Sequence, residues 1–287
     1  MHAPIKLYYH DGHINRKKPL SVLSNLIKYS TLHSPVYNIG DQISPVIVEA
    51  LSARKVLHVQ GFQKHKLISI GSILAAAREG DQIWGSGLKL KEHAQYLKKA
   101  KGFKIHAVRG PLTRKAVENV GISCPEVYGD PALLMPIIYP ISKIQTNKIG
   151  IIPHISQVEE LSELVVGTEY EVISPAMHWR LFLKKINSCR LILSSSLHGI
   201  ILSDAYGVPA IPVKHQSWLS GSPFKFDDYY ASTGRTPNFM DSKLLMDSSA
   251  INEYQASLKT PDIKLKPLVS SFPFDIPDKE LLAKVTE

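Results

Sequence analysis

The chain has 287 residues, of which 44% are hydrophobic and 21% are charged, and this composition excludes a disordered polypeptide. Its 34 Lys and Arg residues against 25 Asp and Glu residues give a formal net charge of +9, which favours an anionic partner such as a phosphorylated small molecule, nucleic acid or an anionic lipid surface. Two widely separated cysteines, Cys124 and Cys189, exclude a disulfide framework and a cysteine-rich metal site.

Nucleic acid is the least favoured of these partners, because the basic runs are short and the aromatic residues do not alternate with them on predicted strands. The polar stretch of residues 1–18 lacks the apolar core of a secretory signal. The most apolar stretch, residues 191–213, is interrupted by serines, His198, Asp204 and Pro209, so it does not predict a membrane span. We therefore expect a cytoplasmic protein.

The first half of the chain alternates short apolar runs with helical patterns. Strands are predicted at residues 5–10, 55–59, 67–70, 82–84, 104–108 and 126–128, with a basic polar loop after the first of them. Helices are predicted at residues 43–51, 94–101 and 112–119. Several of the apolar runs stop at a glycine, as buried parallel strands often do.

Residues 136–147 hold two prolines and polar spacers, and they predict a linker between two domains. The alternation then resumes, with strands predicted at residues 148–152, 170–173, 190–193 and 210–213 and helices at 158–165, 179–187 and 197–205. The pattern after residue 241 is less regular and ends in a predicted helix at residues 278–285.

This alternation predicts an α/β protein with two Rossmann-like domains, whose parallel sheets face each other across a cleft. The N-terminal domain is expected to span residues 1–140 and the C-terminal domain residues 141–287, with the tail packing back on the N-terminal domain. In such sheets, ligands bind beyond the carboxyl ends of the strands.

Several common ligand-binding motifs are missing. Gly85-Ser86-Gly87 has the first two glycines of a dinucleotide fingerprint, but Leu90 stands where the third would be. The sequence has no P-loop and no zinc-protease motif, and it has no Asp-x-Asp pair that would hold a metal-bridged nucleotide-sugar. No metal or other cofactor is expected.

Polar residues instead gather at the predicted ends of strands and starts of helices. Asn38 and Asp41 lie where a helix begins, and amide N–H groups at such a position favour an anion. Arg109 follows a strand, and its forked guanidinium suits a carboxylate or a phosphate. The segment Ser194-Ser195-Ser196-Leu197-His198-Gly199 brings three hydroxyls and an imidazole to the start of a helix.

Five segments in this order resemble the polysaccharide pyruvyl transferase family: Asn38-Ile39-Gly40-Asp41, Trp84-Gly85-Ser86-Gly87, Val108-Arg109-Gly110-Pro111, Gly129-Asp130-Pro131-Ala132 and Ser195-Ser196-Leu197-His198-Gly199. The resemblance covers about residues 38–230. It implies a fold like that of the two-domain GT-B glycosyltransferases, phosphoenolpyruvate as the donor, a saccharide acceptor and no required metal. The family setting allows the acceptor to be lipid-linked and the protein to associate with the inner face of the cytoplasmic membrane, which suits a basic surface.

The resemblance also matches Arg109 and His198 to the family's donor-binding arginine and histidine, with Ser196 and Gly199 beside them. His198 is expected to protonate the donor or to contact its phosphate. The family lysine has two candidates here, Lys225 and Lys214, and we favour Lys225 although residues 215–222 look like an insertion.

Other residues complete the expected site. Asp41 and Asp130 are candidates for activating the acceptor hydroxyls or for orienting Arg109. Asn38, Ser86, Gly87 and His154 are expected to line the cleft.

Two alternatives stay open at this stage. Residues 204–209 loosely resemble the donor-side helix of a glycosyltransferase that uses a nucleotide-sugar, although Asp204 is shorter than that family's usual glutamate. A non-catalytic module that binds glycan or phosphate is the second alternative.

Overall fold

The computed structural model describes residues 2–10, 38–144, 146–214 and 223–286. The basic loop expected after the first strand and the apparent insertion at residues 215–222 both lie outside the described residues.

The first half of the chain builds a parallel sheet of β1 (Ile5–Tyr8), β2 (Val56–His58), β3 (Leu67–Ile68), β4 (Gln82–Trp84) and β5 (Lys104–Ala107), in the order β2-β1-β3-β4-β5. Its helices are α2 (Ile39–Ser52), the 3₁₀ helix η2 (Lys91–Lys99) and α3 (Pro111–Glu118). Helix α2 begins because the Asn38 side chain accepts a hydrogen bond from the Gly40 N–H. Pro111 starts α3 without losing a hydrogen bond, because the first N–H groups of a helix have no partner within it.

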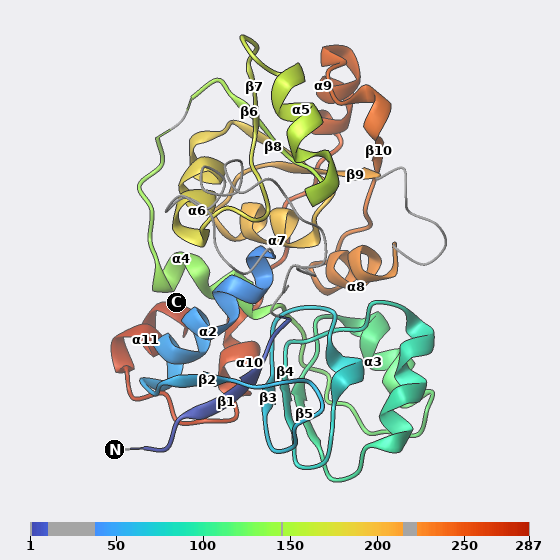
Figure 1. Ribbon diagram of the computed structural model, residues 1–287, viewed down its shortest axis with the longest axis vertical. Helices are drawn as coiled ribbons and strands as arrows, with labels where there is room; N and C mark the ends of the chain where they lie inside the picture. The colour runs from blue at the N-terminus through green and yellow to red at the C-terminus, as the bar shows by residue number, and fades with distance from the viewer. Residues whose placement is uncertain (1, 11–37, 145, 215–222, 287) are drawn as a thin grey trace, which may run out of the picture.

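The second half builds another parallel sheet, of β6 (Ile149–Ile152), β7 (Tyr170–Val172), β8 (Leu191–Ser194), β9 (Ala210–Lys214) and β10 (Met240–Asp241), in the order β10-β9-β8-β6-β7. Its helices include α5 (Val158–Leu164), α6 (Trp179–Ser188) and α7 (Leu197–Ala205). The two sheets occupy the lower and upper halves of the molecule in Figure 1. The predicted α/β fold with two Rossmann-like sheets is therefore confirmed.

Both sheets have the same topology. Counted from the first strand of each half, each sheet reads 2-1-3-4-5 from one edge to the other. Strands 1 and 3, numbered in chain order, are neighbours in the sheet. The chain that leaves strand 1 runs towards one edge of the sheet, and the chain that leaves strand 3 runs towards the other edge. A crevice therefore opens beyond the carboxyl ends of these two strands. In this protein the crevices lie after β1 and β3 in one sheet and after β6 and β8 in the other.

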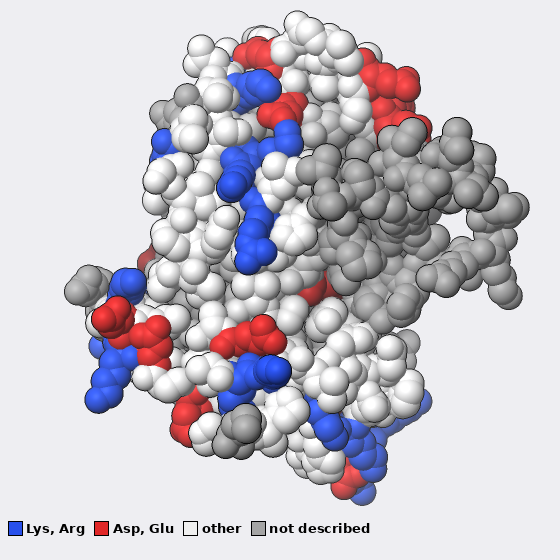
Figure 2. All heavy atoms as spheres, turned by 60° about the vertical axis from the view of Figure 1, so that its left-hand side comes forward, with Lys and Arg blue, Asp and Glu red and all other residues white. Residues whose placement is uncertain are grey.

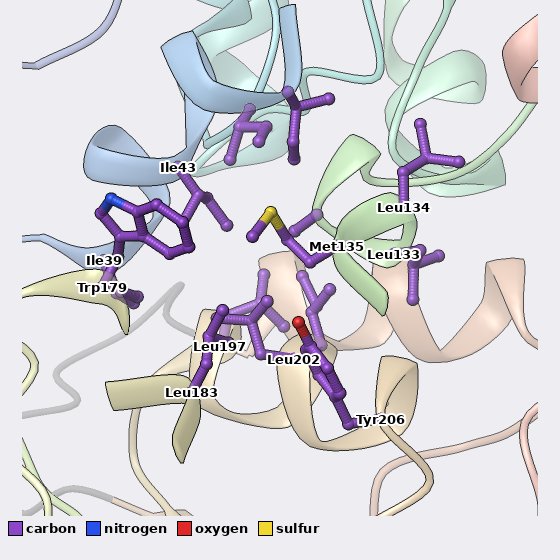
Figure 3. Close-up of a cluster of buried hydrophobic side chains, with 14 of the residues drawn as sticks. Ile39, Ile43, Leu133, Leu134, Met135, Trp179, Leu183, Leu197, Leu202 and Tyr206 are labelled. Atoms are coloured by element: carbon purple, nitrogen blue, oxygen red, sulfur yellow. The ribbon is translucent and has the colours of Figure 1, made fainter. Parts of the chain in front are cut away.

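A continuous apolar core joins the two halves (Figure 3). Ile39 and Ile43 of α2 and Met135 of α4 (Met135–Ile138) belong to the same buried cluster as Leu197 and Leu202 of α7. The 3₁₀ helix η3 (Pro131–Leu134) contacts both α2 and α7. Gln42 adds polar contacts, since its amide donates to the Met177 carbonyl and accepts from the Trp179 N–H.

The end of the chain contains α8 (Phe224–Ser232), the 3₁₀ turn η5 (Ser242–Leu244), α9 (Ser248–Ala256), α10 (Leu265–Ser270) and α11 (Lys279–Thr286). Helix α8 contacts α3, and α11 contacts α4. The Trp84 indole N–H donates to the Leu268 carbonyl over 2.8 Å, and the Trp84 ring meets that of Phe272 edge-on. The division into domains at residues 140 and 141 stays a prediction.

Several expected elements differ from the observed ones. The helix expected at 94–101 is the 3₁₀ helix η2, the strand expected at 126–128 is a single bridge between Val108 and Tyr128, and the expected linker begins with α4. Helix α2 begins at Ile39, four residues before the expected start. The Asn38 cap starts the helix there, whereas the apolar pattern begins only at Ile43. Helices α8, α9 and α10 were not predicted from the sequence.

Candidate functional site

A cavity of about 530 Å³ lies between the two sheets and is lined by both halves of the chain. Its walls come from the loops at the two crevices. His10 follows β1, Ser72 follows β3, His154 follows β6, and the segment 195–198 follows β8. The topological switch points of both sheets therefore open into one cavity, which is where ligands bind in open α/β sheets.

The cavity lining is strongly basic. Lys89, Arg109 and Lys225 line it together with His10, His154 and His198. Asp41 is the carboxylate among the described lining residues. This balance of charge favours an anionic ligand.

Arg109 is completely buried, and its guanidinium is held from several sides. Its Nε donates to Asp228 Oδ2 over 3.0 Å, Nη2 donates to the Leu88 carbonyl, and Nη1 donates to the Ser72 hydroxyl, both over 2.8 Å. The carboxylate partner of Arg109 is thus Asp228 and not Asp130, which corrects the expectation that Asp130 orients it. Sequence reasoning missed Asp228 altogether.

Gly87 lies directly beneath this guanidinium, and a Cβ added there would overlap it. Ser86 donates to the Gly71 carbonyl over 2.9 Å. Neither residue is among those that line the cavity, contrary to expectation. They support the loop and the arginine instead.

His198 is the second residue of α7, is 8% exposed and lines the same cavity as Arg109. Its Nε2 lies 3.7 Å from Oδ2 of Asp130, a fully buried carboxylate whose other oxygen accepts from the Ala132 N–H. The edge of the imidazole that carries Nδ1, Cε1 and Nε2 also lies against Gly40, where a Cβ would overlap the ring. Asp130 therefore contacts His198 but does not itself line the cavity. Direct activation of an acceptor hydroxyl by Asp130 is thus not supported.

The first turn of α7 is open towards the cavity. Ser196, its N-cap, lines the cavity and makes no side-chain capping bond. Ser194 shapes the approach, because its hydroxyl accepts from the Ser196 N–H and donates to the Ser196 carbonyl. Gly199 packs against Ser194 inside the helix and is not a lining residue. Free N–H groups and the helix dipole make such a helix start favourable for an anion.

Asp41 and Asn38 line the cavity at the start of α2. Burial raises the pKa of the Asp41 carboxyl, while the His10 N–H, which donates to it over 2.9 Å, and the nearby His198 work in the opposite direction. A carboxyl with a raised pKa accepts a proton more readily than an ordinary aspartate, which suits a general base.

Of the two candidate lysines, Lys225 on α8 lines the cavity, whereas Lys214 lies exposed at the end of β9 and is not a lining residue. Burial, followed by the charges of Arg109 and Lys89, lowers the pKa of Lys225 to about 8. His154 lines the cavity, as expected. Lys89 and Ser72 were not singled out from the sequence. Both follow strands, so the expectation that ligands bind beyond the carboxyl ends of strands, which pointed to Arg109, applies to them equally.

Asp204 is not among the residues that line this cavity, and it lines a separate pocket instead. It is bound by Arg235 and by the Tyr229 hydroxyl in a buried ion pair. Its carboxylate is thus already engaged by protein groups outside the cavity between the sheets. Among the described residues, no group of three or more His, Cys, Asp or Glu side chains is arranged to hold a metal ion.

Fold and site together define a doubly wound α/β protein with a basic ligand cavity between its two sheets. The family model for polysaccharide pyruvyl transferase matches residues 38–217, more than half of the chain. The protein belongs to this family and is therefore a transferase, as the five sequence motifs predicted.

Two curated proteins are similar to this chain. Uncharacterized protein L143 of Acanthamoeba polyphaga mimivirus is 27% identical over 248 residues, which are 79% of this chain and 82% of that protein. Succinoglycan biosynthesis protein ExoV of Rhizobium meliloti is 32% identical over 145 residues, which are 47% of this chain and 42% of that protein.

Among solved structures, an uncharacterized protein from Klebsiella pneumoniae aligns with a TM-score of 0.44 at 10% identity, over 83% of this chain and 92% of that chain. A similarity this distant adds nothing to the family assignment.

A basic membrane-facing side is expected to show Lys and Arg without interspersed acidic residues. On the face shown in Figure 2, Lys and Arg lie beside Asp and Glu, and neither sign covers the face alone. No helix in the described ranges is both long and apolar enough to cross a membrane.

Proposed function

We propose that this protein transfers the pyruvyl group of phosphoenolpyruvate to two neighbouring hydroxyls of a sugar, in a surface polysaccharide or its precursor, and forms a pyruvate ketal. The observation that carries the proposal is the convergence of Lys89, Arg109, Lys225 and His198 on one cavity. Phosphoenolpyruvate carries both a phosphate and a carboxylate, so it needs several cationic partners. ExoV, a similar chain, is a succinoglycan biosynthesis protein, which supports a polysaccharide acceptor.

The chemistry assigns each group a task. A proton is added to C3 of the enol, and C2 becomes an oxocarbenium-like centre that one sugar hydroxyl attacks. Phosphate then leaves, and the neighbouring hydroxyl closes the ketal. One of the two hydroxyl protons replaces the proton given to C3, and the other leaves with phosphate.

His198 is the proposed acid for C3, and the buried Asp130 carboxylate beside it supplies a counter-ion for the imidazolium form. Arg109, Lys225 and the first turn of α7 with Ser196 bind the donor's anionic groups. Asp41 takes the proton of an acceptor hydroxyl. Asn38 and His154 border the space beside the donor.

The test measures phosphate release from phosphoenolpyruvate with a candidate acceptor glycan, using the wild type, His198→Ala and Arg109→Ala. Loss of a positioned acid should reduce turnover by about 10²–10⁴-fold while the protein stays folded. A folded His198→Ala protein that releases phosphate at a near-normal rate would contradict the assignment.

The same assay separates the two roles open to His198. A fall in kcat with KM for phosphoenolpyruvate unchanged identifies an acid that acts in the transition state, whereas a rise in KM identifies a phosphate contact. Binding of phosphoenolpyruvate without phosphate release in the wild type, across a panel of acceptor glycans, would favour a non-catalytic binding module. Stabilisation by nucleotide-sugars but not by phosphoenolpyruvate would favour a glycosyltransferase.

A further inference from the structure

Asp228 is a buried carboxylate that belongs to the second half of the chain but is bound almost entirely by the first. It lies on α8 and is completely buried. Its Oδ1 accepts from the Thr113 N–H over 2.8 Å, and its Oδ2 accepts from the Thr113 hydroxyl over 2.6 Å and from Arg109 Nε over 3.0 Å. Arg109 Nη2 also lies 3.0 Å from Oδ2.

These contacts determine which edge of the Arg109 guanidinium is available. Nε and Nη2 face Asp228, and Nη2 also donates to the Leu88 carbonyl. Nη1 donates to the hydroxyl of Ser72, which lines the cavity. The Nη1 edge is therefore the one turned towards the ligand space.

The backbone of α8 is held as closely as the carboxylate. Gly110, next to Arg109, lies so near to the Asp228 carbonyl that a Cβ there would overlap it. Lys225 stands three residues before Asp228 on the same helix, which places both on one side of α8. The contact of Asp228 with Arg109 thus fixes the positions of the Arg109 guanidinium and the Lys225 ammonium together.

We propose that Asp228 is a positioning residue for donor binding, which holds the Nη1 edge of Arg109 towards the cavity and anchors the helix that carries Lys225. This inference rests on the proposed function for the identity of the donor. Asp228 does not line the cavity, so it acts through Arg109 and α8. Without the Asp228 charge the arginine loses its counter-ion and the carboxylate that orients its Nε, beside the Lys225 ammonium of like charge.

The experiment compares Asp228→Asn with Asp227→Asn, a control that makes the same change one residue earlier on α8, where the side chain neither lines the cavity nor bonds Arg109. Binding of phosphoenolpyruvate and of inorganic phosphate is measured by calorimetry, and KM, kcat and melting temperature are recorded. Asp228→Asn should weaken binding of both anions by about ten- to a hundredfold, the range of a hydrogen bond to a charged group. Asp227→Asn should bind both anions as the wild type does.

A double-mutant cycle distinguishes positioning from a merely structural role. If Asp228 acts through Arg109, then Asp228→Asn should add less than about twofold to the loss already caused by Arg109→Lys. A lower melting temperature with unchanged affinity and KM, or fully additive losses, would overturn the inference. If Asp228→Asn does not fold, Thr113→Val removes one partner of the carboxylate and should raise KM for phosphoenolpyruvate severalfold. An unchanged KM in that variant counts equally against the inference.

The two anions separate this inference from the proposed function. A wild type that binds phosphate but not phosphoenolpyruvate rejects the donor assignment, while the comparison of Asp228→Asn with Asp227→Asn on phosphate still decides the role of Asp228. A wild type that binds neither anion rejects both.

Discussion

At the scale of single residues, two of the proposed donor-binding side chains pack directly against glycines. Gly40 lies against the His198 imidazole, and Gly87 lies against the Arg109 guanidinium. At both positions the space that a Cβ would need is taken by the ring or the guanidinium. Close approach therefore explains these two motif glycines, and the sequence alone does not show it because their partners are far away along the chain.

We expect Gly40→Ala to displace the His198 ring and to lower turnover, by up to about 10²–10⁴-fold if the imidazole leaves its catalytic position. Ser44→Ala is the matched control, because it lies one turn later on α2 and is not a cavity residue. The measurement is phosphate release at saturating phosphoenolpyruvate, alongside the melting temperature of each variant. Equal activity of the two folded variants would show that the ring tolerates the added methyl group.

The affinity for phosphoenolpyruvate should depend on pH through Lys225. The pKa of Lys225 is lowered to about 8, so its ammonium is present below that pH and is lost as the pH rises through it. Affinity for phosphoenolpyruvate should therefore fall above about pH 8 in the wild type but not in Lys225→Arg, since arginine stays charged.

Titration calorimetry from about pH 6.5 to about pH 9.5 tests this, with Lys214→Arg as the control that keeps the wild-type decline. A wild-type affinity that stays constant over this range, or a decline that persists unchanged in Lys225→Arg, would count against the role of Lys225.

At the scale of elements, the hydroxyl of Ser194 helps to shape the junction between β8 and α7. Ser194 binds both the N–H and the carbonyl of Ser196, which turns the chain from the strand into the helix. This bend leads directly into residues 195–198, which line the cavity.

We expect Ser194→Ala to cost about 1–3 kcal/mol of the free energy of unfolding and also to weaken phosphoenolpyruvate binding, because the segment 195–198 shifts. Ser203→Ala, which removes a bond to the Gly199 carbonyl inside the same helix, should cost similar stability but leave affinity unchanged. Urea unfolding and calorimetry on both variants make the comparison. Affinity losses of the same size in both would show that general loosening of α7, and not the bend, is responsible.

The sequence patterns predicted some helices and strands closely and missed others. Apolar runs such as residues 148–152 and the amphipathic segment 179–187 located β6 and α6 closely, because burial on a sheet or on one helix face leaves a clear period. Helix α8 was missed because its buried positions include Asp228, whose burial depends on Arg109 and Thr113 rather than on apolar character. The expected helix at 94–101 formed as a 3₁₀ helix, which the helical period does not distinguish over so short a segment.

At the scale of the whole molecule, the two halves share one apolar core. Met135 is completely buried in the cluster that includes Ile43 of α2 and Leu202 of α7. The halves should therefore unfold in a single transition despite having separate sheets.

We expect Met135→Ala to lower the free energy of unfolding by about 2–5 kcal/mol and to shift this one transition without splitting it. Leu97→Ala, in the cluster whose fully buried members all lie in the first half, should shift the same transition. Differential scanning calorimetry provides the measurement. Two resolved transitions in the wild type would show that the halves unfold separately.

The placement of the site illustrates the limit of sequence reasoning at this scale. The sequence located His154, Arg109 and His198 after strands, but it could not tell which strands are neighbours. The cavity forms where β1 meets β3 and β6 meets β8, and this order depends on pairings between distant segments. Asp228 could not be found from the sequence for the same reason.

The contacts of the tail have a further consequence for protein engineering. Trp84 binds the Leu268 carbonyl, and Arg54 lies over the ring of Phe274, so the chain that leaves the first sheet near α4 returns to it by α10. The second sheet is thus inserted in sequence between two parts of the first unit. The first and last described elements, β1 and α11, both lie in the lower half of the molecule in Figure 1. Linking α11 to β1 and opening a surface loop of the upper half should therefore give a circular permutant that keeps the same cavity.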